Sequence, residues 1–246
     1  MKTVNAIIKS ITFVLRFLEK TNEKKMTTNK MATATVQPAH HGYTISACTG
    51  TDDELQGILV LQCANRPEAL TAEERASQGF VTARHDVALL RDMNAFLPHI
   101  VARDPITNEV IGYALSLVPT FDIDRIPYLQ GFKSQIASST CQSHSVATSR
   151  HYLIMGQVCV SKAWRGHGMF AALYRALRQL ASSDDNNYDC IVTAVSTQNP
   201  RSLRAHGKVG FVRIREFTDN HNHIWVVLLW DIAKKRPPAD AALPLT

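Results

Sequence analysis

Residues 157–170 read Gln-Val-Cys-Val-Ser-Lys-Ala-Trp-Arg-Gly-His-Gly-Met-Phe, and they are the most informative stretch of the chain. An apolar strand is expected to run toward the turn Arg165-Gly-His-Gly168, and a helix is expected to begin directly after it. Glycines let the backbone approach a phosphate, and the N–H groups and partial positive charge of a helix N-terminus attract an anion. The order of strand, glycine turn and helix therefore predicts an anion-binding cradle.

Both flanks support this order. Residues 152–160 form a largely apolar run, as expected of a buried strand. After the turn, apolar residues at helical spacing make one stripe of a helix expected over 168–181: Phe170, Leu173, Leu177 and Leu180. Two nucleotide-binding motifs are excluded, because no Lys-Ser/Thr pair follows the last glycine and Ala171 stands where the dinucleotide motif has its third glycine. Taken alone, the turn is equally compatible with a purely structural role.

The composition favours one domain of moderate size with additional length. The chain has 246 residues, and 45% of them are hydrophobic, which suffices for a core. Its net charge of +6 suits a phosphorylated cofactor, but the basic residues do not gather beside aromatic ones, so no specific nucleic-acid partner is expected. No run reaches the roughly 18 apolar residues of a transmembrane segment. Five scattered cysteines without a C-x-x-C pair favour reduced thiols and a cytoplasmic location.

Residues 1–42 differ from the rest of the chain. Apolar residues recur at helical spacing over the first 18 positions, basic residues lie off that stripe, and these positions hold no acid. Such a segment could direct the chain to an organelle or to a membrane surface. Alternatively it is a dispensable, flexible extension, since Met26 and Met31 offer later starts. The domain itself is expected over 43–233, followed by a flexible Pro- and Ala-rich tail at 234–246.

The pattern of the domain predicts a mixed α/β sheet with the order β-α-α-β-β-β-α-β-α-β-β. Strands are expected at 43–48, 98–103, 109–118, 151–160, 188–196, 211–217 and 223–232. Helices are expected at 53–64, 86–96, 168–181 and 200–208, and the loop at 65–80 is expected to contain a short helical piece at 71–76. Asp52 is expected to cap the first helix, and a Thr71-x-x-Glu74 capping box the short piece. Residues 119–150 are expected to form a long loop that is functional or mobile.

A second informative stretch begins at Asn199 and reads Asn-Pro-Arg-Ser-Leu-Arg-Ala-His-Gly-Lys-Val-Gly-Phe. Asn199 is a suitable helix N-cap, the proline after it suits the first helical position, and Gly210 is expected to end the helix. Asn199, Ser202 and His206 then share one face of that helix.

Together the two stretches resemble the GNAT superfamily of N-acetyltransferases. Its first motif, Arg/Gln-x-x-Gly-x-Gly/Ala, is met by Arg165 and Gly168 and imperfectly by Phe170, which replaces a small residue. Its second motif, Asn-x-x-Ser/Ala with a later aromatic residue or His and then Gly-Phe, is met by Asn199, Ser202, His206 and Gly210-Phe211. The resemblance covers about residues 43–233. It implies six to seven mostly antiparallel strands, a parallel pair formed by the strands at 151–160 and 188–196, and about four helices.

The resemblance also implies acetyl-CoA as acyl donor and no metal. Backbone N–H groups of 165–170 would hold the pyrophosphate of CoA, and backbone groups of Val158 and Val160 would pair with its pantetheine arm like an added strand. A neighbouring N–H would polarise the thioester carbonyl. The residues implied in cofactor binding are Val158, Cys159, Val160, Arg165, Gly166, His167, Gly168, Met169, Phe170, Asn199 and Ser202.

In this resemblance a substrate amine, on a small molecule or a protein, attacks the thioester directly in a ternary complex. His206 stands where relatives often have a Tyr, so it is a candidate general acid for the departing sulfur; the alternative is a histidine on the helix surface or one satisfied in the core. Relatives often carry a carboxylate on the strand at 151–160, but here Gln157 occupies its middle and is a candidate for positioning water or substrate. The missing carboxylate leaves open a catalytically weak, acyl-CoA-binding sensory or regulatory module.

The general base and the acceptor site have several candidates. Groups that could organise water or reach in from loops are Tyr152, Glu73, Glu74, Asp122 and Asp124. The acceptor site is expected from 65–85, 119–150 and the last two strands, where acids near aromatic rings suit a cationic amine. The aromatic residues of these segments include Phe80, Phe121, Tyr128 and Phe132. A homodimer is compatible with the sequence, and the histidine pairs at 40–41 and 221–223 lack further ligands for zinc.

Overall fold

The computed structural model describes residues 42–126, 129, 131–141, 144–146 and 150–233. All of them belong to the compact unit Thr35–Thr246. The expected N-terminal extension, apart from Gly42, and the expected tail at 234–246 lie outside the described residues. No helix in the described part of the chain is long and apolar enough to cross a membrane.

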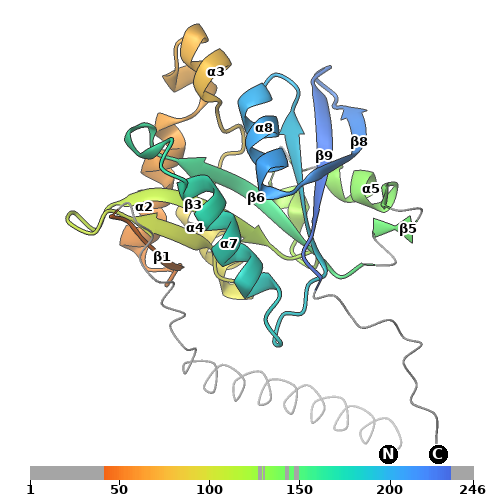
Figure 1. The fold of residues 1–246 in the computed structure, drawn as a ribbon, viewed down its shortest axis with the longest axis horizontal. Helices are drawn as coiled ribbons and strands as arrows, with labels where there is room; N and C mark the ends of the chain where they lie inside the picture. Colours follow the sequence, from red (N-terminus) through yellow and green to blue (C-terminus); the bar gives the residue numbers. More distant parts are fainter. Residues whose placement is uncertain (1–41, 127–128, 130, 142–143, 147–149, 234–246) are drawn as a thin grey trace, which may run out of the picture. The chain divides into compact units, whose positions relative to one another are not determined.

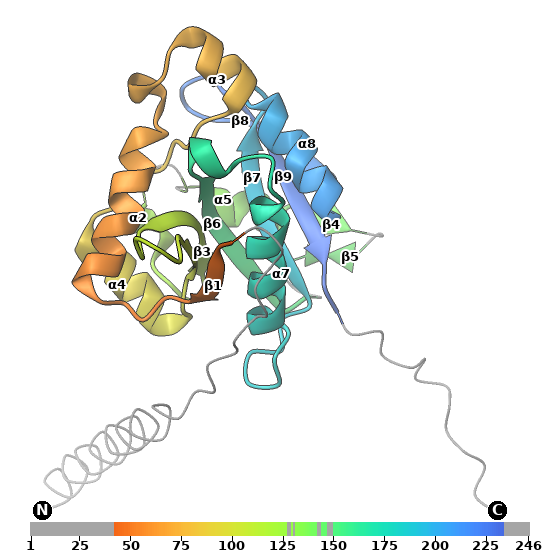
Figure 2. The same cartoon turned by 60° about the vertical axis from the view of Figure 1, so that its left-hand side comes forward.

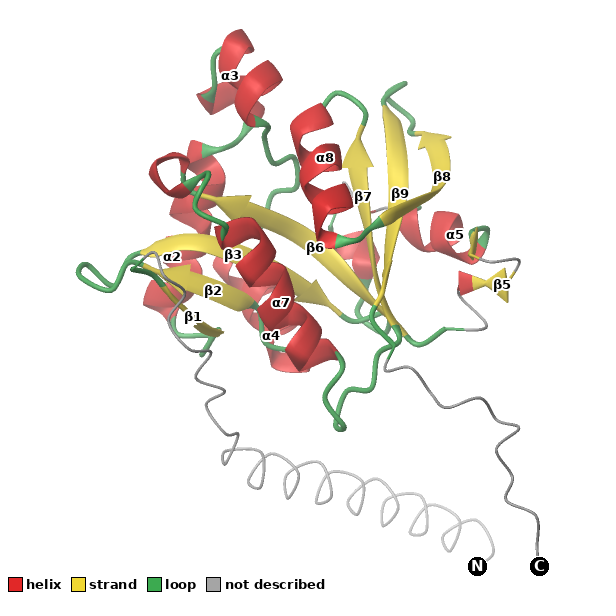
Figure 3. Cartoon of the chain, viewed as in Figure 1, coloured by secondary structure: helices red, strands yellow, loops and turns green. Residues whose placement is uncertain are grey.

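A seven-stranded mixed sheet forms the centre of the domain, in the order β1-β2-β3-β6-β7-β9-β8 (Figures 1 and 3). β6 and β7 are parallel, and the other neighbouring strands are antiparallel. This confirms the predicted mixed sheet with its parallel pair. The strands are β1 Thr44–Ala47, β2 Ile100–Arg103, β3 Val110–Leu117, β6 Tyr152–Val160, β7 Cys190–Ser196, β8 Val212–Thr218 and β9 Ile224–Asp231.

Helices cover both faces of the sheet (Figure 2). They are α2 Asp52–Ala64, α3 Ala72–Gln78, α4 Val87–Phe96, α5 Phe132–Ala137, α7 Met169–Ala181 and α8 Pro200–Val209. Tyr113 and Gln157 point to the α2 side, where Gln62 bonds to Gln157. Gly112 faces α7 so closely that a Cβ there would lie 2.7 Å from the sulfur of Met169. The central strands are therefore buried on both faces, which explains their nearly continuous apolar sequence.

Two local expectations differ from the structure. Thr51, not Asp52, is the N-cap of α2, and Asp52 opens the first turn, where its charge suits the helix dipole. Residues 119–150 are not one loop: they contain a 3₁₀ turn Ile123–Arg125, α5 and the hairpin β4 Thr140–Cys141 with β5 His144–Ser145. Their periodicity is weak because these elements are very short. The expected Thr71 capping box is confirmed, with the Glu74 N–H donating to Thr71 Oγ1 at 3.1 Å.

The strands β6 and β7 part after three residue pairs, Tyr152–Ile154 with Cys190–Val192, and the place where they part is here called the fork (Figure 3). A bulge accompanies the fork, because Leu115 pairs with Gln157 while Ser116 pairs with Met155, which leaves Gly156 as an extra residue in β6. Bulges bend a strand and increase its twist. The edge of residues 157–160 that faces β7 is therefore open to a ligand.

Candidate functional site

A pocket of about 310 Å³ lies at the fork. The end of β6, the glycine turn, α7, α8 and residues from 65–81 line it. The lining residues are Asn65, Gln78, Gly79, Phe80, Val81, Val158, Cys159, Val160, Trp164, Arg165, Gly166, Gly168, Met169, Phe170, Ala171, Asn199, Arg201, Ser202, Ala205, Lys208 and Val209. This set includes every residue expected to bind the cofactor except His167. Its charged members are basic, and no Asp or Glu occurs among the described lining residues, so the pocket favours an anionic ligand.

The open edge of β6 presents backbone groups at alternate residues. The Ser161 N–H donates to the Ile111 carbonyl at 2.8 Å, so this pair is hydrogen-bonded across the two antiparallel strands. Hydrogen-bonded and non-hydrogen-bonded pairs alternate in such a ladder. The N–H and C=O groups of Val160 and Val158 therefore point away from β3 and into the fork. An extended ligand can pair with them as an added strand would.

The glycine turn leads to an N-terminus of α7 that has no side-chain cap within the described chain. Gly166 and Gly168 have φ values of +86° and +76°, a region that suits glycine. No described atom lies within 4 Å of a Cβ built on either residue, so the space in front of the turn is open. Backbone N–H groups without intrahelical partners meet the helix dipole here, an arrangement that suits an anion.

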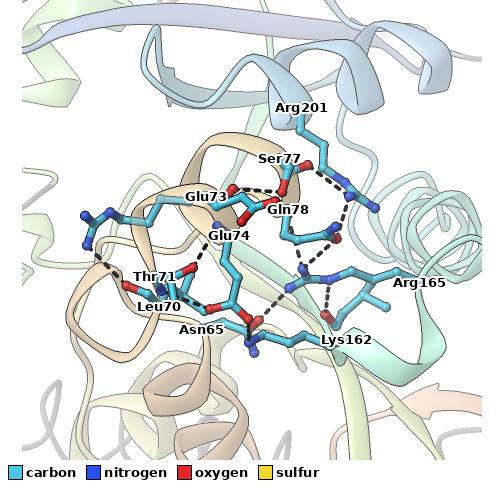
Figure 4. Close-up of polar contacts among 12 residues, drawn as sticks. Asn65, Leu70, Thr71, Glu73, Glu74, Ser77, Gln78, Lys162, Arg165 and Arg201 are labelled. Atoms are coloured by element: carbon cyan, nitrogen blue, oxygen red, sulfur yellow. Dashed lines mark hydrogen bonds and ion pairs between the residues drawn. The ribbon is translucent and has the colours of Figure 1, made fainter.

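The guanidinium of Arg165 is turned toward the protein. Its Nε donates to the Val160 carbonyl at 3.0 Å, and its Nη2 donates to Asn65 Oδ1 at 2.5 Å. Its Nη1 donates to the backbone carbonyl of Gln78 at 3.2 Å (Figure 4). This geometry argues against the phosphate contact expected for the side chain, because most of its donors are already engaged.

Asn199 is the N-cap of α8, as expected, and its amide serves the fold. Its Oδ1 accepts from the Ser202 N–H at 3.1 Å, and its Nδ2 donates to the Phe80 carbonyl at 2.9 Å. The side chain thus joins α8 to the segment that follows α3. Asn199 and Ser202 line the pocket, but the Asn199 amide is engaged with backbone groups.

His206 is a buried core residue with 1% of its surface exposed. Its Nδ1 donates to the Ser202 carbonyl at 2.8 Å, and its Nε2 accepts from the Tyr174 hydroxyl at 2.7 Å. Burial lowers its pKa to about 4. Because the ring is neutral near pH 7, has both nitrogens engaged and lies outside the pocket lining, the structure argues against the general-acid role. The ring of Phe170 packs edge-on against it with centroids 5.1 Å apart, which gives the bulky residue at this motif position a place between α7 and α8.

The side-chain amide of Gln157 also forms hydrogen bonds within the core, through both its oxygen and its nitrogen. Its Oε1 accepts from the Tyr113 hydroxyl at 2.6 Å and from Gln62 Nε2 at 2.8 Å, while its Nε2 donates to the Ala83 carbonyl at 3.0 Å. The side chain is buried on the α2 side of the sheet and does not line the pocket. These contacts argue against the expected positioning of water or substrate.

The other candidates for the base whose side chains the structure describes lie apart from the pocket lining. Both carboxylate oxygens of Glu74 are engaged, one with Lys162 Nζ at 2.5 Å and one with the Thr71 N–H. Glu73 and Tyr152 are not among the lining residues, and Asp122 is exposed. Tyr128 and the side chain of Asp124 lie outside the described part of the structure.

The aromatic candidates for the acceptor site divide into core and pocket residues. Phe121 and Phe132 are buried in the core, and Phe80 lines the pocket. The residues that sequence reasoning did not single out are Asn65, Gln78 and Arg201, which come from segments distant in sequence. No group of three His, Cys, Asp or Glu side chains that could hold a metal ion is found among the described residues.

We expect the protein to lose stability as the pH falls from about 6.5 toward 4. Burial lowers the pKa of His85 and His206 to about 4 and that of His99 to about 3. The unfolded chain binds these protons at higher pH than the native state, so acid favours unfolding. For His206 alone the loss would reach about 3 kcal/mol. Urea unfolding at pH 7.0 and 5.0 measures the change, and equal unfolding free energies at the two values would contradict it.

A sequence model of the acetyltransferase (GNAT) family matches residues 67–211. No curated protein has a sequence that matches this chain. Among similar solved structures, the NatC complex bound to Gag peptide and CoA has 14% identity and a TM-score of 0.52, with 77% of this chain and 98% of that chain covered. A putative acetyltransferase from Salmonella typhimurium with its cofactor acetyl-CoA has 17% identity and a TM-score of 0.50, covering 81% and 99%. A putative acetyltransferase from Acinetobacter baylyi has 15% identity and a TM-score of 0.51, covering 80% and 98%.

Proposed function

Because this chain belongs to the GNAT acetyltransferase family, we propose that it is an N-acetyltransferase that moves an acetyl group from acetyl-CoA to an amine in a ternary complex. One observation carries the proposal: the open edge of β6 and the N-terminus of α7 meet in one pocket. The edge suits the amide groups of an extended pantetheine arm, and the helix N-terminus suits a pyrophosphate. Similar structures that hold CoA or acetyl-CoA support this assignment.

The reaction would proceed by direct attack on the thioester. The amine nitrogen bonds to the carbonyl carbon, the C–S bond breaks, and CoA leaves as a thiolate that takes up a proton. A backbone N–H of the β6 edge, at Val158 or Val160, would stabilise the developing oxyanion. Because no carboxylate occurs among the described pocket-lining residues, the amine would enter in its neutral form and give its surplus proton to water.

One observation favours a second function, an acyl-CoA-binding regulatory module with weak catalysis. The two side chains expected to assist the chemistry, Gln157 and His206, have their hydrogen-bonding groups engaged within the core. The pocket would then bind the acyl donor without a protein group placed to move a proton.

Thiol release from acetyl-CoA separates the two functions. The full chain is mixed with acetyl-CoA and a thiol-reactive dye, and a panel of polyamines, amino acids and peptides with a free N-terminus is added in turn. We expect release only with an accepted amine, an equimolar acetylated product by mass spectrometry, and a rate that rises with pH through the pKa of that amine. Tight acetyl-CoA binding without release from any amine would favour the regulatory module.

A further inference from the structure

Residues 66–80, here called the strap, form a loop that contacts both the segment after β6 and the helix α8. Their two ends are held together, because the Val81 N–H donates to the Asn65 carbonyl at 3.0 Å. The strap contains a 3₁₀ turn Pro67–Ala69 and the helix α3. Figure 4 shows its contacts with both sides: Glu74 with Lys162 on the β6 side, and Ser77 with Arg201 on α8.

Arg165 joins the strap to the open edge of β6. It donates hydrogen bonds to Gln78 in the strap and to Asn65, which directly precedes the strap. Its Nε donates to the carbonyl of Val160 at the edge of β6. The Gln78 side chain bridges further, since its Oε1 accepts from Arg201 Nη1 at 2.6 Å and from Arg165 Nη1 at 3.4 Å. The guanidinium of Arg165 is planar and donates to several carbonyl oxygens at once, so its orientation is fixed.

The contact with Val160 matters because of where that carbonyl points. It is one of the groups that face the fork. Without Arg165 it would be free to accept a hydrogen bond from a ligand and so extend the edge on which the ligand pairs. Pairing along a strand repeats every two residues, and a slip by one repeat keeps the same hydrogen-bond pattern while moving the ligand by about 6.6 Å. Such a slip would carry a thioester away from its acceptor.

We propose that Arg165 is a positioning residue that acts as a register stop: it covers the Val160 carbonyl, so pairing of the pantetheine arm ends at the Val160 N–H. Asn65 and Gln78 hold the guanidinium in this place. The inference rests on the proposed function, since it concerns the same ligand. It differs from a phosphate-binding role, in which the positive charge of the side chain would be what matters.

Two ligands distinguish a register stop from a phosphate contact. Adenosine 3′-phosphate 5′-diphosphate carries the phosphates of CoA without the pantetheine arm, and acetyl-CoA carries both. Calorimetry measures both affinities, and thiol release at saturating acetyl-CoA measures kcat, in Arg165→Lys and Arg165→Gln. Arg204→Gln is the control, because it removes an exposed positive charge of α8 that does not line the pocket.

For a register stop, we expect both Arg165 variants to keep the affinity for the arm-free ligand within about twofold. Their affinity for acetyl-CoA should also stay within about twofold, because the slipped arm pairs with the freed Val160 carbonyl. Their kcat should fall at least about tenfold, because the slip moves the thioester away from its acceptor. Arg165→Lys should not restore kcat, because lysine keeps the positive charge but lacks the planar set of donors of a guanidinium. Gln78→Ala, at the end of α3, should lower kcat in the same way but to a smaller extent, and it guards against misfolding of the Arg165 variants.

The opposite pattern would overturn the inference. Equal weakening of both ligands in Arg165→Gln, with recovery in Arg165→Lys, would make Arg165 a phosphate contact. Unchanged acetyl-CoA affinity and kcat in the Arg165 variants and in Gln78→Ala would leave the strap without influence on the ligand. Failure of the unsubstituted chain to bind acetyl-CoA is a separate result, which would remove the proposed function itself.

Discussion

Gly168→Glu is expected to lower the affinity for acetyl-CoA by at least about a hundredfold, which corresponds to about 2.7 kcal/mol. Gly168 is the N-cap of α7 with φ +76°, and a side chain there costs about 1–2 kcal/mol in backbone strain. The added carboxylate would also lie at the N-terminus where the pyrophosphate is proposed to bind, so the two negative charges would repel each other. Calorimetric titration with acetyl-CoA measures the loss.

Gly131→Glu is a matched control for this change. Gly131 is the N-cap of α5, has the same φ of +76°, and has no described atom within 4 Å of a built Cβ. It carries the same backbone strain and does not line the pocket. Both variants should lose similar stability, while Gly131→Glu keeps its affinity for acetyl-CoA. Undiminished affinity in Gly168→Glu would refute the assignment of the cofactor site to this turn.

His206→Ala is expected to lower the free energy of unfolding by about 3 kcal/mol. The ring fills space between Phe170, Tyr174 and Phe211, with centroid distances of 5.1, 5.4 and 5.2 Å. Truncation opens a cavity there and leaves the buried Tyr174 hydroxyl without its partner Nε2. Urea unfolding at pH 7 measures the change.

His221→Ala is the control, because His221 lies exposed in the turn between β8 and β9 and its loss should change stability by less than about 0.5 kcal/mol. In His206→Ala the dependence of kcat on pH should keep its shape near neutrality, because the native imidazole is neutral there and its one N–H is donated to the Ser202 carbonyl. A lost alkaline limb in that profile would restore His206 as a general acid.

The local features of the fold could be predicted from the sequence. Asn199 caps α8, Thr71 caps α3, and Gly210 ends α8 with φ +119°, because each of these conformations depends on residues within a few positions. The glycine turn before α7 was predicted for the same reason, since one continuous segment builds it; its role as an anion cradle stays a prediction. Gly156 within β6 is a signal that could have indicated the bulge, since an isolated glycine in a strand often marks one.

The roles of individual side chains could not be predicted, because distant residues decide them. Arg165 points to Gln78, 87 positions away, and His206 bonds to Tyr174, 32 positions away. A motif gives the residue types and their spacing within one segment. It says nothing of hydrogen-bond partners, such as Gln78 and Tyr174, that lie in other segments. Arg165 and His206 therefore matched the motif while their side chains serve the packing around the pocket.

We expect the sheet to bend most easily at the fork between β6 and β7, so that the fork acts as a hinge. Three residue pairs, Tyr152–Ile154 with Cys190–Val192, join the part containing β1, β2, β3 and β6 to the part containing β7, β9 and β8. A change in the angle between these parts would change the width of the pocket, so a ligand that touches the lining residues of both β6 and α8 would favour one angle. Substitutions at Ile154 or Val192 would thus change ligand affinity through the stiffness of the hinge, without contact to the ligand.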